Sequence, residues 1–503
     1  MEKKSFFTND IIILVLIAIC GTLLHIILNG QYGFHRDELD IIMNAKQLDW
    51  GYVAYPPFTP FIARVGLILF GNSLRGLRVF SALAQGVVMV LAGCMSRDMG
   101  GKRSAQVMAA LAVYIAPVAL TAGTLIQYMA FDFFWWVLIA FFFVRLLATS
   151  NPRYWLGIGA GIGFGMMTKF TVAFWVIGLV VAILLSQRRK DLFTKWLWFA
   201  VALALLIYLP NLIWQIQHEF ISLDFLKAIH ARDLQWGRGR NFLPEQITSS
   251  TNPFTLPLWV AGLFSCLFSV SMRRFRPLAW LFLVTLTIFL VAQGRSYYIA
   301  PAYVMLLAAG CTWCLNEFAK RSEVLRRAGI GLLYSLIAVG GLAGIVLIKP
   351  VAPINSDLWK ITSKLNPEAV EMVGWPDLAI QVQSIYQLIP EIEKSRTVIL
   401  AGNYGEAGAL DMYGPDLGLP PVISGADSFW YRGYGNQEPE TVIVVGMDLG
   451  FAEQFFRNCT SAGTVTNRYG VWNEETSRHT RMFICRNTHR AWSEMWNDML
   501  WFQ

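Results

Sequence analysis

The chain has 503 residues, of which 55% are hydrophobic and only 15% charged, and its mean hydropathy is +0.47. A soluble globular protein rarely has this balance, so the composition predicts a polytopic membrane protein. The net charge of +8 would by itself suggest a nucleic-acid partner. The basic residues instead gather in alternate short loops, which excludes that interpretation and is typical of membrane topology.

Eleven apolar runs are candidate membrane spans. They lie at about 11–28, 78–96, 104–122, 130–148, 154–168, 170–186, 194–213, 255–271, 277–293, 298–315 and 328–348. No small-residue cleavage site follows the first run, which favours a retained anchor over a signal peptide. The fifth run is short, and if it does not cross, the topology downstream of it inverts.

The fifth run is also rich in glycine. Gly157, Gly161 and Gly165 stand four residues apart, so they share one side of a helix and let a neighbouring helix approach closely. A phosphate-cradling loop is disfavoured, because no strand precedes the run and no Gly-Lys-Ser/Thr follows it.

The distribution of lysine and arginine predicts the orientation. Six short loops are basic and are expected to be cytoplasmic by the positive-inside rule. They contain Lys3 and Lys4; Arg97, Lys102 and Arg103; Arg145 and Arg153; Arg188, Arg189, Lys190 and Lys195; Arg273, Arg274 and Arg276; and Lys320, Arg321, Arg326 and Arg327. The loops around Asp37, Lys169 and Arg295, and the C-terminal part of the chain, then lie on the opposite face.

Two domains are predicted. Residues 1–348 form a mainly α polytopic membrane domain, whose long first external loop, 30–77, contains a twelve-residue apolar helix at 59–70 that lies in the membrane interface. Residues 349–503 form a small external α/β domain. It has a helix near 375–390 and β-rich runs at 397–401, 441–445 and 482–485. Its two cysteines, Cys459 and Cys485, lie where oxidation is permitted, and whether they pair is left open.

Two acidic sites at external ends of spans are candidates for chemistry. Asp37 and Glu38 follow the first span, and adjacent helical side chains diverge by about 100°, so the two cannot do the same job. One can face a cleft while the other caps the helix, pairs with Arg36 or binds a metal. The alternative is an ordinary acidic first turn. Asp132 lies amid aromatics at the start of the fourth span, where a carboxylate is costly unless it is paired or hydrated, which favours a functional role; the alternative is a helix N-cap.

Three basic residues lie in the external loops, where few are expected: Arg36, Lys169 and Arg295. Cations at headgroup depth suit a lipid phosphate, although snorkelling without a ligand is the alternative for each. His35 with Asp37, Glu38 or Asp132 could supply mixed nitrogen and oxygen ligands to a divalent metal ion, but no fixed-spacing metal motif is present.

Several motifs resemble those of the membrane glycosyltransferases with the C-type fold, in the group that contains protein O-mannosyltransferases and the lipid A aminoarabinose transferase. The similarity is greatest to bacterial members of unassigned acceptor. The matching segments are Phe34-His35-Arg36-Asp37-Glu38-Leu39, Trp50-Gly51-Tyr52 with Pro56-Pro57, Met167-Thr168-Lys169, Pro210-Asn211-Leu212-Ile213-Trp214-Gln215, Arg295-Ser296-Tyr297-Tyr298-Ile299-Ala300-Pro301, Gly402-Asn403-Tyr404-Gly405-Glu406-Ala407 and Gly418-Leu419-Pro420-Pro421.

This resemblance implies a sugar donor carried on polyprenyl phosphate and transfer on the external face. It implies that Asp37 is the base and that Asp132 occupies the second acidic position. The chain departs from aminoarabinose transferases at Ala54-Tyr55, where those enzymes carry Glu-Lys before the two prolines. The phosphate contact of that lysine, and that acceptor, are therefore not implied here.

The sequence thus leads to one functional hypothesis, an inverting glycosyltransferase of the bacterial inner membrane with Asp37 as general base and a lipid, glycan or protein hydroxyl as acceptor. Glu38 and Asp132 complete the predicted catalytic set. The predicted lipid-phosphate site consists of Arg36, Lys169, Arg295, Tyr297 and Tyr298, and the predicted donor or acceptor pocket of His35, Tyr55, Pro56, Pro57, Asn403, Tyr404 and Glu406.

A secondary transporter or lipid flippase is the alternative function, and a non-catalytic scaffold is a third. A transporter predicts inverted repeats and ionisable residues at span midpoints. Here the charges gather at external ends, and no two halves of the sequence resemble each other.

Overall fold

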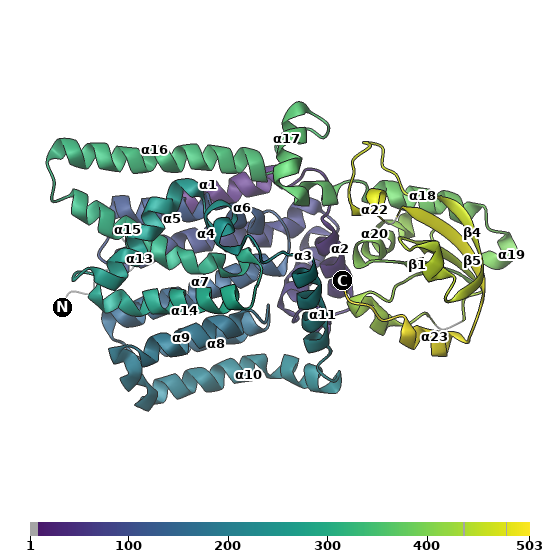
Figure 1. The fold of residues 1–503 in the computed structure, drawn as a ribbon, viewed down its shortest axis with the longest axis horizontal. Helices are drawn as coiled ribbons and strands as arrows, with labels where there is room; N and C mark the ends of the chain where they lie inside the picture. The colour runs from purple at the N-terminus through teal and green to yellow at the C-terminus, as the bar shows by residue number, and fades with distance from the viewer. Residues whose placement is uncertain (1–8, 436–437, 479) are drawn as a thin grey trace.

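The computed structural model describes residues 9–435, 438–478 and 480–503, so the predicted basic residues Lys3 and Lys4 lie outside the described residues. The protein is mainly helical. Long helices run side by side through most of its length, and a small sheet domain lies at one end of them (Figure 1). The first external loop and α11 (Ile221–Gln235) lie between the two parts.

Seven helices of the described chain are long and apolar enough to cross a membrane, or up to nine segments if each of two bent pairs is one span. The seven contain α1 (Asn9–Leu28), α4 (Leu74–Asp98), α7 (Tyr128–Thr149), α10 (Lys195–Gln217), α14 (Arg276–Val291), α15 (Tyr303–Phe318) and α16 (Glu323–Ile348). The bent pairs are α9 (Val172–Leu184) with η1 (Gln187–Phe193), and the segment Phe242–Ser250 with η3 (Pro253–Thr255) and α13 (Leu256–Phe268).

Two of the eleven expected spans are too short in the structure. The run at 104–122 divides into α5 (Arg103–Tyr114) and α6 (Pro117–Ala122), because a residue before proline is pushed out of the helical region, and Ala116 has ψ 131°. The Gly-rich run forms α8 (Tyr154–Met166), whose 13 residues rise about 20 Å, short of a hydrocarbon core of about 30 Å.

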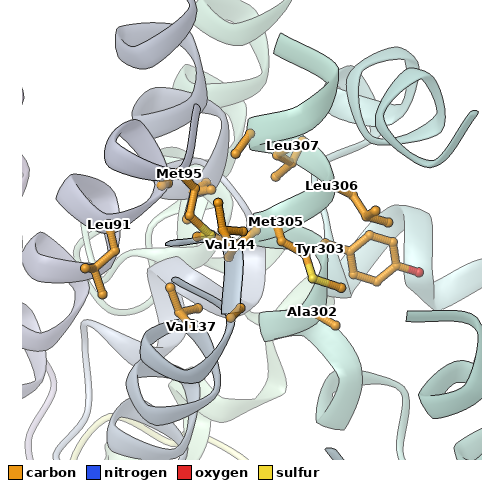
Figure 2. Packing of buried hydrophobic residues seen from close by; sticks show 14 of the residues in the cluster. Leu91, Met95, Val137, Val144, Ala302, Tyr303, Met305, Leu306 and Leu307 are labelled. Atoms are coloured by element: carbon orange, nitrogen blue, oxygen red, sulfur yellow. The ribbon is translucent and has the colours of Figure 1, made fainter. Parts of the chain in front are cut away.

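The membrane domain is packed around α4, α7 and α15. Met95 of α4, Val137 and Val144 of α7, and Met305 of α15 converge in one buried cluster (Figure 2). They bring together helices from three distant parts of the sequence.

The glycines of α8 have the predicted packing role. A Cβ added at Gly157 would lie 2.7 Å from the ring of Phe142, and one at Gly161 would lie 2.8 Å from Ile139, both on α7. Gly159, on another side of α8, lies equally close to the backbone of α10 at Ala200. Larger side chains at these positions would push both neighbouring helices away.

The first external loop contains two helices. They are α2 (Arg36–Lys46) and α3 (Phe58–Phe70), the second of which begins one residue before the predicted helix at 59–70. Phe61, Ile68 and Leu69 are more than half exposed on α3. This apolar face fits a helix that lies in the membrane interface.

The C-terminal part carries a five-stranded mixed sheet of order β2-β1-β3-β5-β4. The strands are β1 (Thr397–Ala401), β2 (Val422–Ile423), β3 (Thr441–Val445), β4 (Phe456–Thr464) and β5 (Arg481–Thr488). β1 pairs in parallel with β2 and β3, and β5 is antiparallel to β3 and β4. The predicted runs became β1, β3 and β5. Because β4 is largely exposed and polar and β2 has two residues, the apolar pattern did not predict either.

α17 (Asp357–Leu365) follows α16 and lies beside its end (Figure 1). Six further short helices belong to the sheet domain: α18 (Trp375–Gln387), α19 (Glu391–Lys394), α20 (Tyr404–Tyr413), α21 (Leu449–Ala452), α22 (Glu474–Ser477) and α23 (Trp492–Asp498). The helix predicted near 375–390 is α18. Its Leu378, Val382 and Ile385 are buried in a cluster that also contains Leu39 and Ile42 of α2. The sheet domain therefore packs directly on the first external loop.

Cys459 and Cys485 are cross-strand neighbours on β4 and β5 and form a disulfide. The bond closes a loop with a sequence separation of 26, for which chain entropy gives about 2–4 kcal/mol of stabilisation.

We expect Cys485→Ser to lower the melting temperature of the purified protein and to abolish the shift in gel mobility on reduction. Cys20→Ser, which removes an exposed free cysteine, is the control. A wild-type protein whose mobility and melting do not change with reductant would contradict the bond.

Candidate active site

The acidic motif of the first loop forms the start of α2. His35 is the N-cap residue, and its Nδ1 accepts a hydrogen bond from the backbone N–H of Asp37 at 3.2 Å. The Glu38 carboxylate accepts from the backbone N–H of His35 at 2.8 Å, which completes a capping box. The motif therefore fixes the direction of each side chain in the first turn.

Glu38 is completely buried and faces Arg78 at the start of α4. Arg78 donates from Nε and Nη2 to the two carboxylate oxygens at 2.9 and 2.5 Å, and the backbone N–H of Ile126 donates to Oε1 at 2.9 Å. The suggested pairing of Glu38 with Arg36 is wrong. Because it is enclosed in this way, Glu38 orients α2 and is not accessible to a substrate. Its position therefore differs from that of the predicted catalytic residue Asp37.

Asp37 points the other way, and its side chain is 25% exposed. The Tyr404 hydroxyl on α20 donates to Oδ1 at 2.8 Å, and the Gln127 amide before α7 donates to Oδ2. Each carboxylate oxygen retains a second lone pair, so the group can still accept a proton. The carboxylate thus lies where the first loop, the membrane helices and the sheet domain meet.

Arg36 and His35 face acidic residues of the C-terminal part. Arg36 forms an ion pair with Glu474 and lies 4.9 Å above the Tyr404 ring. The Nε2 atom of His35 is 2.9 Å from Glu368. Burial of the ring, and the hydrogen bond that Nδ1 accepts, favour the neutral form of His35. The nearby carboxylates, including Asp37 and Glu368, favour the cation, and the net effect raises the pKa of His35 to about 9. Both residues attach the loop to the sheet domain, and Arg36 is not a free cation for a phosphate.

Lys169, in the short turn between α8 and α9, lies in a cage of three tyrosines. Its ammonium is 4.6 Å from the ring centroid of Tyr128, 5.2 Å from that of Tyr297 and 4.3 Å from that of Tyr298. Cation–π attraction holds the ammonium without neutralising it. No ion pair with a carboxylate is formed by Lys169 within the described chain. The predicted phosphate residues Lys169, Tyr297 and Tyr298 are thus brought together.

Two consecutive residues connect this cage to Asp37. Gln127 donates to the Asp37 carboxylate, and Tyr128, the next residue, forms one wall around Lys169. A potential proton acceptor and a cation are therefore each held by one of two consecutive residues at the start of α7. Transfer with an anionic leaving group requires both kinds of group at one site.

Asp132 lies one turn further along α7. Its two oxygens accept hydrogen bonds from the indole N–H of Trp136 at 3.1 Å and the hydroxyl of Thr171 at 3.0 Å, and the residue is 4% exposed. The N-cap alternative is wrong, because α7 begins at Tyr128 and its N-cap is Gln127. Asp132 supports the turn that carries Lys169.

Arg295 does not offer the free cation that was predicted. Its Nε and Nη2 donate to the Asp233 carboxylate of α11 at 2.6 and 3.0 Å, and Arg238 lies 3.4 Å from the same carboxylate. Two guanidinium groups therefore share one carboxylate, which leaves net positive charge on this side.

The predicted pocket residues have several different roles. The Tyr55 hydroxyl donates a hydrogen bond to the Asp40 carboxylate and accepts one from the Asn44 amide at 2.7 Å. Pro56 and Pro57 immediately precede α3. Of the predicted pocket residues Asn403, Tyr404 and Glu406, Tyr404 alone forms a hydrogen bond with Asp37. Asn403 and Glu406 form a second capping box, at the start of α20. Both are buried, so their inclusion in a substrate pocket is corrected.

The buried carboxyl group of Glu406 is expected to make the stability of the folded protein depend on pH. Burial, with the nearby Glu475, raises the pKa of its carboxyl from 4.5 to about 8, against backbone N–H groups that favour the charged form. Because the folded state binds the proton more tightly, this contribution to stability is full below about pH 4.5 and is lost as pH rises through about 8. We expect Glu406→Gln to gain melting temperature relative to wild type between pH 5 and pH 8. Glu391→Gln, at an 88% exposed side chain, should follow wild type. Parallel curves for all three proteins would contradict the assignment.

The predicted metal ligands are not gathered at one point. His35 and Asp37 are 3.9 Å apart, but the partners of Asp132 are Trp136 and Thr171. Within the described ranges, no group of three or more His, Cys, Asp or Glu side chains is arranged to hold a metal ion. The residues present therefore do not fit the metal set His35, Asp37 and Asp132.

Sequence reasoning missed five charged or amide partners of the site residues: Arg78, Gln127, Asp233, Glu368 and Glu474. Arg78 begins the predicted second span, and a charge there was a usable signal. The others have ordinary polar types at ordinary positions, so only the fold identifies them.

The helical membrane unit, the acidic first loop and the small sheet domain together define the C-type glycosyltransferase fold. Two structures of ArnT from Cupriavidus metallidurans have this architecture, one in the apo state (TM-score 0.56, 14% identity) and one bound to undecaprenyl phosphate (TM-score 0.52, 18% identity). Each comparison covers 93% of this chain and 97% of the other. The predicted fold class is confirmed.

Sequence comparisons lead to the same group. Residues 54–214 match the family described as dolichyl-phosphate-mannose-protein mannosyltransferase. An undecaprenyl phosphate-alpha-4-amino-4-deoxy-L-arabinose arabinosyl transferase of Pseudomonas fluorescens is 27% identical over 66% of this chain and 60% of its own length. The lipopolysaccharide core galacturonosyltransferase RgtB of Rhizobium johnstonii is 26% identical over 63% of this chain and 57% of its own. The chain thus spans less than two thirds of these relatives. The resemblance to the C-type-fold membrane glycosyltransferases of the protein O-mannosyltransferase and aminoarabinose transferase-like group is thus confirmed as a similarity of sequence and fold.

Proposed function

We propose that this protein transfers a sugar from a polyprenyl-phosphate-linked donor to an acceptor hydroxyl at the external face of the bacterial inner membrane. The observation that supports the proposal is that two consecutive residues, Gln127 and Tyr128, contact the partly exposed Asp37 carboxylate and the caged ammonium of Lys169, which forms no ion pair within the described residues. The names of the relatives, which include undecaprenyl phosphate donors, support the donor class.

The proposed reaction is a single displacement. The acceptor oxygen attacks the anomeric carbon while its proton passes to Asp37, and the bond between that carbon and the phosphate oxygen breaks. The polyprenyl phosphate leaves with the bonding electrons. Lys169 stabilises the negative charge that grows on it, aided by the Tyr297 and Tyr298 hydroxyls and by the excess positive charge at Arg295 and Arg238. Attack from the side opposite the leaving group inverts the anomeric centre.

The proposed orientation rests on the charge distribution. The basic loops are assigned to the cytoplasm by the positive-inside rule, with the N-terminus on that side. The eleven crossings expected from the apolar runs are an odd number, and they would put the sheet domain on the external face. Asp37 then lies outside, next to the membrane, where a lipid-borne donor and a polar acceptor can meet.

The experiment that tests the function uses the detergent-purified full chain with labelled undecaprenyl phosphate sugars. Lipids and lipopolysaccharide extracted from bacterial membranes serve as acceptors. We expect release of undecaprenyl phosphate that depends on the acceptor, and a product with inverted anomeric configuration by NMR. Movement of the donor across proteoliposomes without any bond cleavage would overturn the proposal in favour of a flippase.

The caged lysine gives a separate prediction about donor binding. Lys169→Met should weaken binding of undecaprenyl phosphate at least about tenfold, because the variant keeps most of the unbranched side chain and loses its charge. Lys195→Met is the matched control, since Lys195 also lies beside an aromatic ring, 5.7 Å from the centroid of Trp196, in a loop predicted to be cytoplasmic. Equal affinity in the two variants, measured by microscale thermophoresis, would remove Lys169 from the donor site.

A further inference from the structure

A cavity that none of the predicted site residues line lies at the far end of α2. Its volume is about 250 Å³, and it is formed by the end of α2 and the loop after it, the end of α10, and η8 (Asp427–Arg432) of the sheet domain. Drug-sized ligands usually occupy about 300–1,000 Å³, so this space suits a single ring rather than a lipid chain.

One side of the cavity is aromatic. The His218 ring stacks on Trp214 with 3.9 Å between ring centroids, and Tyr431 meets His218 edge to face at 5.2 Å. Tyr431 is 42% exposed. Trp214 is buried beneath His218, so the open ring surface belongs to His218, at the end of a membrane helix, and to Tyr431 of the sheet domain. It matches the C–H face of a sugar ring, which is apolar and flat.

The other side is polar and held in place. Asp49 accepts from the indole N–H of Trp214 at 2.8 Å, and Arg432 donates to the Asn44 side-chain oxygen at 3.0 Å. Within the described residues Arg432 has no ion pair at 4.0 Å or less, although it lies near Asp40. The Asn44 amide already donates to Asp40 and Tyr55, so it fixes Arg432 in place. The Asp49 carboxylate and the Arg432 guanidinium are planar groups of the kind that can each bond two neighbouring hydroxyls.

The cavity lies at the end of the helix face that carries the proposed base, Asp37. Asp37, Asp40 and Asn44 are spaced by three and four residues, so they share one face of α2, and Asn44 donates to Asp40 at 3.2 Å. Seven residues of helix separate Asp37 from Asn44, a rise of about 10 Å. A ring in the cavity is therefore not itself the one attacked, but it can belong to the same molecule.

We propose that this cavity binds a sugar residue of the acceptor, remote from the hydroxyl that reacts, so that the acceptor is a glycan or glycolipid. This inference rests on the proposed function for its role in transfer, but binding of a saccharide does not depend on it. The combination of an aromatic wall with planar polar groups carries the inference. A lipid chain would leave those polar groups desolvated without partners.

The first test measures binding without turnover. The labelled full chain in detergent is applied to an array of immobilised bacterial oligosaccharides, as wild type and as Tyr431→Ala and His218→Ala. We expect wild type to bind at least one class of saccharide and each variant to lose binding at least tenfold. Tyr469→Ala, at a tyrosine of similar exposure (45%), and His489→Ala are the matched controls and should bind as wild type. No saccharide binding by wild type, or binding by both cavity variants that equals that of wild type, would overturn the inference.

The second test measures transfer. If the donor is turned over, Tyr431→Ala should raise KM for the acceptor at least tenfold while KM for the donor and kcat stay unchanged. An unchanged acceptor KM would overturn the cavity assignment and leave the proposed function intact. Saccharide binding that is lost in the variants, together with no donor cleavage by wild type, would instead overturn the transferase and leave the cavity as a sugar site.

Discussion

Asp37→Asn is expected to lower the rate of transfer by about 100- to 10,000-fold, the usual contribution of a positioned general base. The substitution keeps the size of the side chain and removes its ability to take a proton. Tyr404 can still donate to the remaining oxygen, and the Gln127 amide can turn to present its own oxygen to the new NH₂ group. The local structure should therefore survive, and the loss should appear in kcat at saturating donor and acceptor.

Asp411→Asn is the control for this prediction, since Asp411 is a surface carboxylate that pairs with Lys46 at 3.1 Å. It should retain wild-type turnover, and both variants should melt as wild type. Donor binding by Asp37→Asn should also be unchanged, which separates a lost base from a damaged site. Turnover within a few fold of wild type would show that another group accepts the proton.

Arg78→Met is expected to have the largest effect on stability. It leaves the Glu38 carboxylate buried without its cation, and removes donors to the carbonyl oxygens of Asn29 and Gly33. Removing one partner of a buried ion pair typically costs about 3–5 kcal/mol. We expect a large fall in melting temperature and poor recovery of monodisperse protein from detergent.

The double variant Glu38→Gln with Arg78→Met should recover part of this loss, because it leaves no buried charge. Arg326→Met is the matched control. Arg326 also binds a glutamate through Nε and Nη2, at 2.8 and 2.7 Å from Glu323, but on an exposed surface where the pair contributes little. A similar melting temperature for the two single variants would contradict the structural role of the buried pair.

Local patterns in the sequence determined much of the fold. Apolar runs located the long helices, the four-residue glycine spacing of α8 indicated its contact with α7, and apolar β-rich runs located β1, β3 and β5. The acidic motif identified the first loop as the site. These features depend on residues close together in the chain, and the repeat of a helix or strand makes such spacing readable.

The tertiary structure alone decided which charges are available for chemistry. Glu38 and Asp37 are adjacent in sequence, yet one is closed off by Arg78 and the other opens between Gln127 and Tyr404, 367 residues away. Arg295 resembled Lys169 as an external cation, but Asp233 on the unexpected helix α11 pairs with it. No spacing rule relates such partners, because their approach depends on how helices pack. The sequence therefore determined the type of protein and its candidate reactive loop, and the packing of distant helices against the sheet domain determined the geometry of the candidate site.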